Sequence, residues 1–181
     1  SEYLGYELDC DKLVESFHRS YGLPVTIARP FNTFGPRQSA RAVIPAILTQ
    51  VLSGKTEIRL GDVSPVRDFN YVGDVVAGFL ALARSPRAVG EVVNLGSGKG
   101  VTIRRTVQLI ARLTNRRIRV RRDPARDRPA ASEVFRLIAS NRKARRLAGW
   151  RPTWTLEDGL RKTAAYLLGH LEDYKTDLYN V

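Results

Sequence analysis

Apolar residues recur at helical spacing along much of the chain. Steps of three or four residues connect Cys10, Leu13, Val14, Phe17 and Tyr21. This spacing predicts a helix with one buried face, and Gly22 and Pro24 end it. The same period predicts further helices over about 40–52, 72–83 and 103–113, and two more after about residue 131.

Two of these helices have a well-marked apolar side. In the helix at 72–83, the helical period connects Val72, Val75, Val76, Phe79, Leu80 and Ala83. The last helix begins at Thr155 and Asp158, which have the spacing of a capping box. Its predicted buried side holds Leu156, Leu160, Thr163, Leu167, Leu168 and Leu171.

Short apolar or alternating runs predict strands between the helices. These strands cover residues 23–28, 57–61, 67–72, 91–95 and 117–121. In the last one, alternation places Arg117, Arg119 and Arg121 on one face, which is expected of a solvated edge strand whose charges discourage edge pairing. Strands that alternate with helices imply a mainly parallel sheet, so we predict one α/β unit over residues 1–181 without a domain break.

The stretch from Arg29 to Gln38 leaves the end of the first predicted strand. Its two prolines, Gly35 and Asn32 predict a loop. Ligands of open α/β sheets collect at the carboxyl ends of the strands, so this loop is a candidate ligand wall. The alternative is an ordinary turn, because asparagine also stabilises turns through its own backbone.

The composition is that of one ordinary domain. A chain of 181 residues with 43% hydrophobic residues can bury a core. The single cysteine, Cys10, permits no internal disulfide, and His18 and His170 lack the partners of a metal site, so we predict no metal. No run approaches the roughly 18 apolar residues that span a bilayer, which predicts a cytoplasmic protein without membrane contact.

The net charge of +12 favours an anionic partner, whether nucleic acid, a membrane surface or a phosphorylated small molecule. Ten arginines lie between Arg104 and Arg128, where Asp123 and Asp127 are the acidic residues. No aromatic residue lies among these arginines to stack on bases, so nucleic acid is the less favoured partner.

Six motifs occur in a fixed order along the chain. They are Tyr3, the loop 29–38, Arg67-Asp68-Phe69-Asn70-Tyr71-Val72, Asn94-Leu95-Gly96-Ser97-Gly98, Asp127-Arg128-Pro129 and Leu147-Ala148-Gly149-Trp150-Arg151-Pro152. Together they resemble the carboxyl-terminal half of the extended short-chain dehydrogenases that modify nucleotide sugars, namely NAD-dependent epimerases, 4,6-dehydratases and decarboxylases. The resemblance runs from Ser1 to about Leu168.

The resemblance implies an incomplete Rossmann-like, mainly parallel sheet plus a small α/β substrate-binding subdomain. The amino-terminal cofactor-binding half, with its glycine-rich phosphate loop, is expected upstream of Tyr3 and absent from this chain. The turn Gly96 to Gly100 does not replace that loop, because Val101 breaks the G-x-G-x-x-G spacing. The implied cofactor is NAD or NADP, and we expect this chain alone to bind it poorly.

Tyr3 corresponds to the catalytic tyrosine of the family, which takes a proton from a sugar hydroxyl and also contacts the cofactor. A phenol has an ordinary pKa of about 10 and needs a nearby cation to act at neutral pH. The family has a lysine four residues later, whereas this chain has Glu7. A carboxylate there would raise the pKa of a neighbouring phenol. Lys12 is nine residues from Tyr3, about 180° away around the helix, and does not substitute.

The resemblance also implies the remaining contacts. Pro30 and Phe31 would border the nicotinamide. Asn32, Arg67, Asn94 and Arg128 would hold the diphosphate of the nucleotide sugar, for which the planar fork of arginine is well suited. The segments 43–45 and 58–60 would line the base and ribose pocket, with Val43, Pro45 and Arg59 among their residues. The helix at 4–21 matches one through which family members pair as homodimers.

Three functional hypotheses follow. The first is the substrate-binding half of a nucleotide-sugar 4,6-dehydratase or epimerase, with the dehydratase preferred because the loop 29–38 resembles that branch. The second is a non-catalytic nucleotide-sugar binder, in which Glu7 has ended the chemistry. The third and least favoured is a basic nucleic-acid-binding module, suggested by the charge of +12.

Overall fold

The computed structural model describes residues 2–126 and 134–174, and side chains are described from Cys10 onward. The helices are α1 (Glu2–Tyr21), α2 (Val43–Leu52), α3 (Val72–Ala83), α4 (Ile103–Leu113), α5 (Arg142–Ala148) and α6 (Leu156–Leu168). The strands are β1 (Ile27–Pro30), β2 (Thr33–Phe34), β3 (Glu57–Leu60), β4 (Val66–Arg67), β5 (Asn70–Tyr71), β6 (Val92–Leu95), β7 (Val101–Thr102), β8 (Arg119–Arg122) and β9 (Arg136–Leu137). Short 3₁₀ turns lie at Pro86–Ala88, Pro124–Arg126 and Leu171–Asp173.

The strands form small, mainly parallel sheets, as the sequence predicts. β1 pairs with β6, β2 with β5 and β3 with β8, all in parallel. β4 lies between β7, which is antiparallel to it, and β9, which is parallel. The run at 67–72 is therefore not one strand: it contains the end of β4, a corner at Asp68 and Phe69, and β5. The loop 29–38 likewise contains the end of β1 and all of β2.

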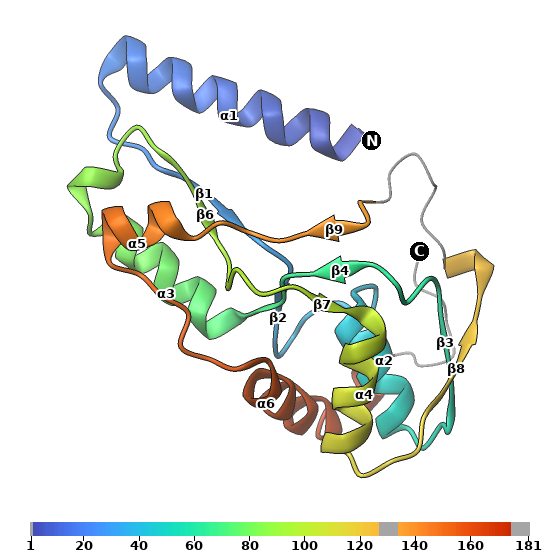
Figure 1. The fold of residues 1–181 in the computed structure, drawn as a ribbon. Helices are drawn as coiled ribbons and strands as arrows, with labels where there is room; N and C mark the ends of the chain where they lie inside the picture. The colour runs from blue at the N-terminus through green and yellow to red at the C-terminus, as the bar shows by residue number, and fades with distance from the viewer. Residues whose placement is uncertain (1, 127–133, 175–181) are drawn as a thin grey trace.

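Buried side chains form two clusters. The larger one packs α2, α4 and α6 against β3, and its fully buried members include Ile47, Ile58, Ile110 and Leu160. The smaller one joins α3, α5 and β6 through Leu82, Val93, Leu95, Ala144 and Trp150. Figure 1 shows these groups as the lower helices and the region around β1 and β6.

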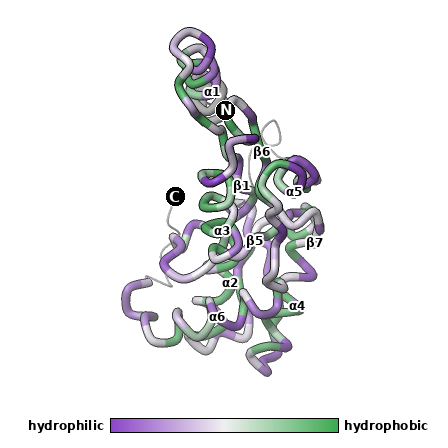
Figure 2. Tube along the Cα trace, turned by 90° about the vertical axis from the view of Figure 1, so that its left-hand side faces the viewer, coloured by the Kyte–Doolittle hydropathy of each residue, from purple (hydrophilic) through white to green (hydrophobic). Residues whose placement is uncertain are grey.

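The buried face predicted for the first helix is wrong for this chain. Leu13, Phe17 and Tyr21 are 59%, 46% and 78% exposed. Figures 1 and 2 show α1 at one end of the molecule, apart from the other helices. It is connected to the rest at its middle, where Asp11 pairs with Arg29 of β1, and near its end, where the carbonyl of Leu23 lies 2.7 Å from Nδ1 of His18. The amphipathic period is real, but no other described element covers the apolar side.

The period also predicts the wrong stripe in α3. Val75 is buried, whereas Val76, Phe79 and Leu80 are 51%, 46% and 51% exposed. The helix is apolar on most sides, so its own pattern does not determine which side is buried. The buried side is the one at Gly78, where β6 packs against the helix. A Cβ at Gly78 would lie 2.9 Å from both methyl groups of Leu95, which means that glycine permits the close approach of β6.

The signals at the carboxyl end of the chain are mostly confirmed. The hydroxyl of Thr155 accepts the N–H of Asp158 at 3.1 Å and caps α6. Leu160, Thr163 and Leu167 are buried as predicted, but Leu168 is 63% exposed. The arginines of β8 are exposed, as expected of an edge strand. No helix among the described residues has the length and apolar character needed to cross a membrane.

Candidate functional site

The carboxyl ends of β1 and β6 lie at the same edge of their sheet. The two strands are parallel, with Pro30 opposite Leu95, and the N–H of Phe31 donates to the carbonyl of Leu95 at 2.9 Å. The loop 31–38 and the turn 96–100 therefore leave the sheet side by side. This is the edge at which open α/β sheets bind ligands. The structure thus brings two of the predicted motifs together.

Asp68 holds this edge together. It is fully buried, and its Oδ1 accepts the N–H and the hydroxyl of Ser97 at 3.1 Å and 2.5 Å. Its Oδ2 accepts the N–H groups of Gly98 and Ala139 at 2.9 Å and 3.2 Å. A buried carboxylate requires such a set of donors, because an unpaired buried charge is very unfavourable. Asp68 thereby fixes the corner after β4 against the turn after β6.

Asn32 is the predicted ligand residue with the most unusual environment. Its backbone has a φ of 20°, a sparsely populated conformation that asparagine tolerates better than most residues. Its carbonyl accepts the N–H of Asn70 at 3.1 Å. Its side-chain Nδ2 is buried and has no hydrogen-bond partner among the described residues. An unpaired buried donor costs about 1–3 kcal/mol, which a ligand with an acceptor oxygen would recover.

Arg67 lies at the end of β4, between Val101 of β7 and Leu137 of β9. It is only 8% exposed, and its Nη1 donates to the carbonyls of Val66 and Phe135 at 3.0 Å and 3.4 Å. Asp68, which holds the turn 96–98, is the next residue along the chain. A guanidinium is well suited to bind phosphate oxygens, because its planar fork can donate two parallel hydrogen bonds.

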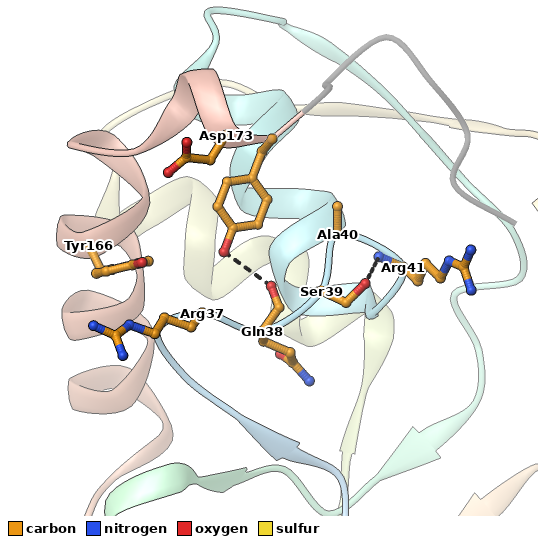
Figure 3. A pocket seen from close by; sticks show the side chains of 8 residues that line it. Arg37, Gln38, Ser39, Ala40, Arg41, Tyr166 and Asp173 are labelled. Carbon is orange, nitrogen blue, oxygen red and sulfur yellow. Dashed lines mark hydrogen bonds between the residues drawn. The ribbon is translucent and has the colours of Figure 1, made fainter.

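An open hollow of about 650 Å³ continues from the far end of the loop. It is lined by Arg37, Gln38, Ser39, Ala40, Arg41, Tyr166, Asp173 and Tyr174, as Figure 3 shows. The phenol of Tyr174 donates to the carbonyl of Gln38 at 3.2 Å. Burial, then the neighbouring Tyr166 and Asp173, raise the pKa of Tyr174. Among the predicted site residues whose side chains the structure describes, none lines this hollow.

The other predicted residues are more scattered. Asn94 lies in β6 opposite Arg29, near the same sheet edge as Pro30. Val43 and Pro45 lie at the start of α2, where Pro45 is buried and Val43 packs against the larger core cluster. Arg59 is exposed on β3, in a separate sheet, opposite Arg121.

Three predicted residues lie where their side chains are not described. Tyr3 and Glu7 are in the first turns of α1, but their side chains, like all of Arg128, lie outside the described part of the structure. Within that part, no group of three or more His, Cys, Asp or Glu side chains could hold a metal ion.

Sequence reasoning missed the residues that brace the site. Asp68 and Asn70 both lie within a recognised motif, yet their partners are separated from them by 29 to 71 residues. The signal in the sequence was that the carboxylate of Asp68 and the amide of Asn70 alternate with the apolar residues Phe69, Tyr71 and Val72, as buried polar groups with distant partners would. Asp74 has a similar role, because it accepts the N–H groups of Thr153 and Trp154 at 2.9 Å and 3.0 Å.

Comparison with known proteins agrees with this arrangement. The profile of the GDP-mannose 4,6 dehydratase family matches residues 8–163. A UDP-glucose epimerase of Bacillus subtilis, itself described as uncharacterized, is 31% identical over 167 residues, which are 92% of this chain and 52% of that protein. The chain spans about half the length of the curated relatives it matches.

Solved structures give the same result. UDP-glucose 4-epimerase from Thermotoga maritima, crystallised with UDP-glucose, is 32% identical with a TM-score of 0.81, over 91% of this chain and 52% of that one. The dTDP-glucose 4,6-dehydratase from Bacillus anthracis, in complex with NAD, is 27% identical with a TM-score of 0.83, over 97% and 54%. The chain therefore belongs to the GDP-mannose 4,6-dehydratase family, within the NAD-dependent epimerases and dehydratases that act on nucleotide sugars.

Proposed function

We propose that this chain is the nucleotide-sugar-binding half of an NAD- or NADP-dependent 4,6-dehydratase or epimerase. The observation that carries the proposal is the buried Nδ2 of Asn32, which has no hydrogen-bond partner among the described residues, at the carboxyl edge of β1 and β6. This donor is available to a diphosphate oxygen, and Arg67, which is 8% exposed and directly precedes Asp68, is a candidate for the positive charge that a diphosphate needs. The resemblance of the loop 29–38 favours the dehydratase.

Each residue has a defined part in this proposal. Asn32 and Asn94 donate to the diphosphate from the sheet edge, and Arg67 and Arg128 neutralise its charge. Val43, Pro45 and Arg59 border the base and ribose. Tyr3 accepts the proton of a sugar hydroxyl, and Pro30 and Phe31 border the nicotinamide. The bound cofactor supplies the hydride acceptor.

The cofactor side requires residues that this chain does not contain. Its sequence holds no glycine-rich phosphate loop, and among the described strands β1 pairs with β6 only. The exposed side chains Val76, Phe79 and Leu80 of α3 add an apolar surface nearby. These features support a second, cofactor-binding half that covers them.

Calorimetric titration of the chain with UDP-glucose, GDP-mannose and dTDP-glucose at fixed salt tests the proposal. We expect one of these ligands to bind more tightly than the others, and NAD to bind weakly or not at all. Arg67→Ala should weaken the binding at least tenfold, because a charge-assisted hydrogen bond contributes about 1.5–3 kcal/mol. Arg145→Ala on the exposed side of α5 is the matched control and should have no effect.

Two results would contradict the proposal. Tight binding of NAD to this chain alone would show that the cofactor site is here. Equal binding of all three sugars, together with steeply salt-dependent binding to DNA or RNA, would favour the nucleic-acid hypothesis instead.

The second candidate is a non-catalytic nucleotide-sugar binder, which Glu7 favours because the family has lysine at this position. A fusion protein that joins this chain to the cofactor-binding half of a relative separates the two candidates. If Glu7 alone blocks the chemistry, Glu7→Lys in the fusion restores turnover. A fusion that already turns over with Glu7 in place excludes the non-catalytic candidate.

We further propose a cytoplasmic location and a homodimer that pairs through the helix at 4–21. The exposed apolar side chains of Leu13, Phe17 and Tyr21 support this pairing. Sedimentation should show a dimer for the chain and a monomer for Phe17→Ser. A dimer that survives this substitution would contradict the assignment of α1 as the contact.

A further inference from the structure

Asn70 holds the backbone on which the predicted ligand residue Asn32 stands. It lies in β5 and is only 3% exposed. Its N–H donates to the carbonyl of Asn32 at 3.1 Å, and its Nδ2 donates to the carbonyl of Phe31 at 2.8 Å. The same Nδ2 contacts the carbonyl of Asp68 at 2.9 Å. One residue therefore fixes two consecutive carbonyls of the loop.

These contacts explain why Asn32 keeps its unusual backbone conformation. A non-glycine residue with a φ of 20° persists only when its surroundings determine it from several sides. The flanking carbonyls at 31 and 32 are both held by Asn70, and the pairing of Thr33 with Asn70 continues the constraint into β2. The direction of the Asn32 side chain therefore depends on Asn70.

Asn70 is not the residue that folding alone would favour at this position. Its Oδ1 is buried and has no hydrogen-bond partner among the described residues. A β-branched residue suits a buried strand better, and it brings no unpaired oxygen. The Nδ2 group of Asn70 donates to the loop at Phe31 and to the corner at Asp68, whereas its Oδ1 accepts no hydrogen bond from the described residues, so this side chain connects the loop to the corner.

We propose that Asn70 is a positioning residue that aims Nδ2 of Asn32 at the diphosphate of the nucleotide sugar. This inference rests on the proposed function. In this proposal Asn70 does not touch the ligand, and it fixes the conformation of Asn32, which does. In Asn70→Val the backbone bond to Asn32 remains, and the side-chain bonds to Phe31 and to Asp68 are lost. Asn32 is then free to leave the conformation that the ligand requires.

A double-mutant cycle tests the proposal. The probes are UDP-glucose, GDP-mannose and dTDP-glucose, titrated calorimetrically into the wild-type chain, Asn32→Ala, Asn70→Val and the double variant. We expect each single substitution to weaken the binding about tenfold, the loss of one hydrogen bond to phosphate. The double variant should be no more than about twofold weaker than Asn32→Ala, because residues that act as one unit are not additive.

Thr153→Val is the control for the loss of one side-chain hydrogen bond to a buried group elsewhere in the chain. It removes the hydroxyl that donates to Oδ1 of the buried Asp74 at 2.9 Å. Its affinity should equal that of the wild type. If Asn70→Val does not fold, as judged by circular dichroism, Asn70→Ala takes its place, since it removes the amide without adding volume.

The outcomes separate this inference from the proposed function. If the wild-type chain binds none of the three sugars, the proposed function fails and this inference fails with it. If the wild type binds but Asn70→Val does so equally well, or if the two losses multiply in the double variant, only the positioning role is overturned.

Discussion

Replacing Asp68 with asparagine should destabilise the chain more than any conservative change at its surface. Asparagine keeps the shape and one oxygen, which can still accept the N–H and the hydroxyl of Ser97. Its NH₂ group would instead meet the N–H groups of Gly98 and Ala139, which now donate to Oδ2. Two donors thus lose their acceptor.

The size of the loss follows from the burial of these two donors. Ala139 is 6% exposed, so its N–H would stay unsatisfied at a cost of about 1–3 kcal/mol. Gly98 is exposed, and water would replace part of its bond. We therefore expect Asp68→Asn to lower the free energy of unfolding by about 2–3 kcal/mol. Ser97→Ala, which removes one donor to the carboxylate, should lower it by about 1–2 kcal/mol.

Urea unfolding followed by tryptophan fluorescence measures these differences, because Trp150 is buried in the smaller core cluster. Asp158→Asn is the control, an acidic residue exposed at the start of α6. It should cost less than about 1 kcal/mol. If Asp68→Asn stays within about 0.5 kcal/mol of the wild type, as surface substitutions do, the role assigned to this carboxylate is refuted.

Three further predictions concern the helices and the hollow. The raised pKa of Tyr174 means that the folded state favours the neutral phenol more than the unfolded state does. The resulting contribution to the free energy of unfolding is present below about pH 10 and is lost as the pH rises above it. A titration of tyrosinate absorbance should therefore show a late-titrating phenol that disappears in Tyr174→Phe, and an unchanged curve would contradict this. Gly78→Ala should lower the free energy of unfolding by about 1–2 kcal/mol, because its Cβ would lie 2.9 Å from the methyl groups of Leu95; a stabilised protein in urea unfolding would show that β6 can move away. Thr155→Ala should cost about 1 kcal/mol through loss of the cap on α6, measured by thermal unfolding, with Thr155→Ser retaining most of the stability.

Much of the local structure could be predicted from the sequence, for a local reason. Helical periods, the Thr155 cap and glycine ends depend on residues a few positions apart, so the helices appear close to where the pattern places them. The short strands were less certain, because β4 and β5 are two residues each and are separated by a corner. Pairing partners decide such strands, and no local pattern records them.

The candidate site depended on the resemblance and on contacts between distant residues. The motifs indicated Asn32, Arg67 and Asn94, and the parallel pairing of β1 with β6 brings the first and last of these to one sheet edge. The brace formed by Asp68 and Asn70 was not predicted, because hydrogen bonds to residues far along the chain leave no periodic signal.

The sequence by itself determined about where the helices lie, that the strands are mainly parallel and which family the motifs resemble. Only the tertiary structure decided which side of a helix is buried. Leu13 and Phe17 form an apolar stripe in α1, yet they are exposed. An apolar period indicates that burial of that surface would be favourable. It does not indicate which element, if any, covers the surface. For the same reason the structure, and not the pattern, assigned Asp68 to the turn at 97–98 and Asn70 to the loop that contains Asn32.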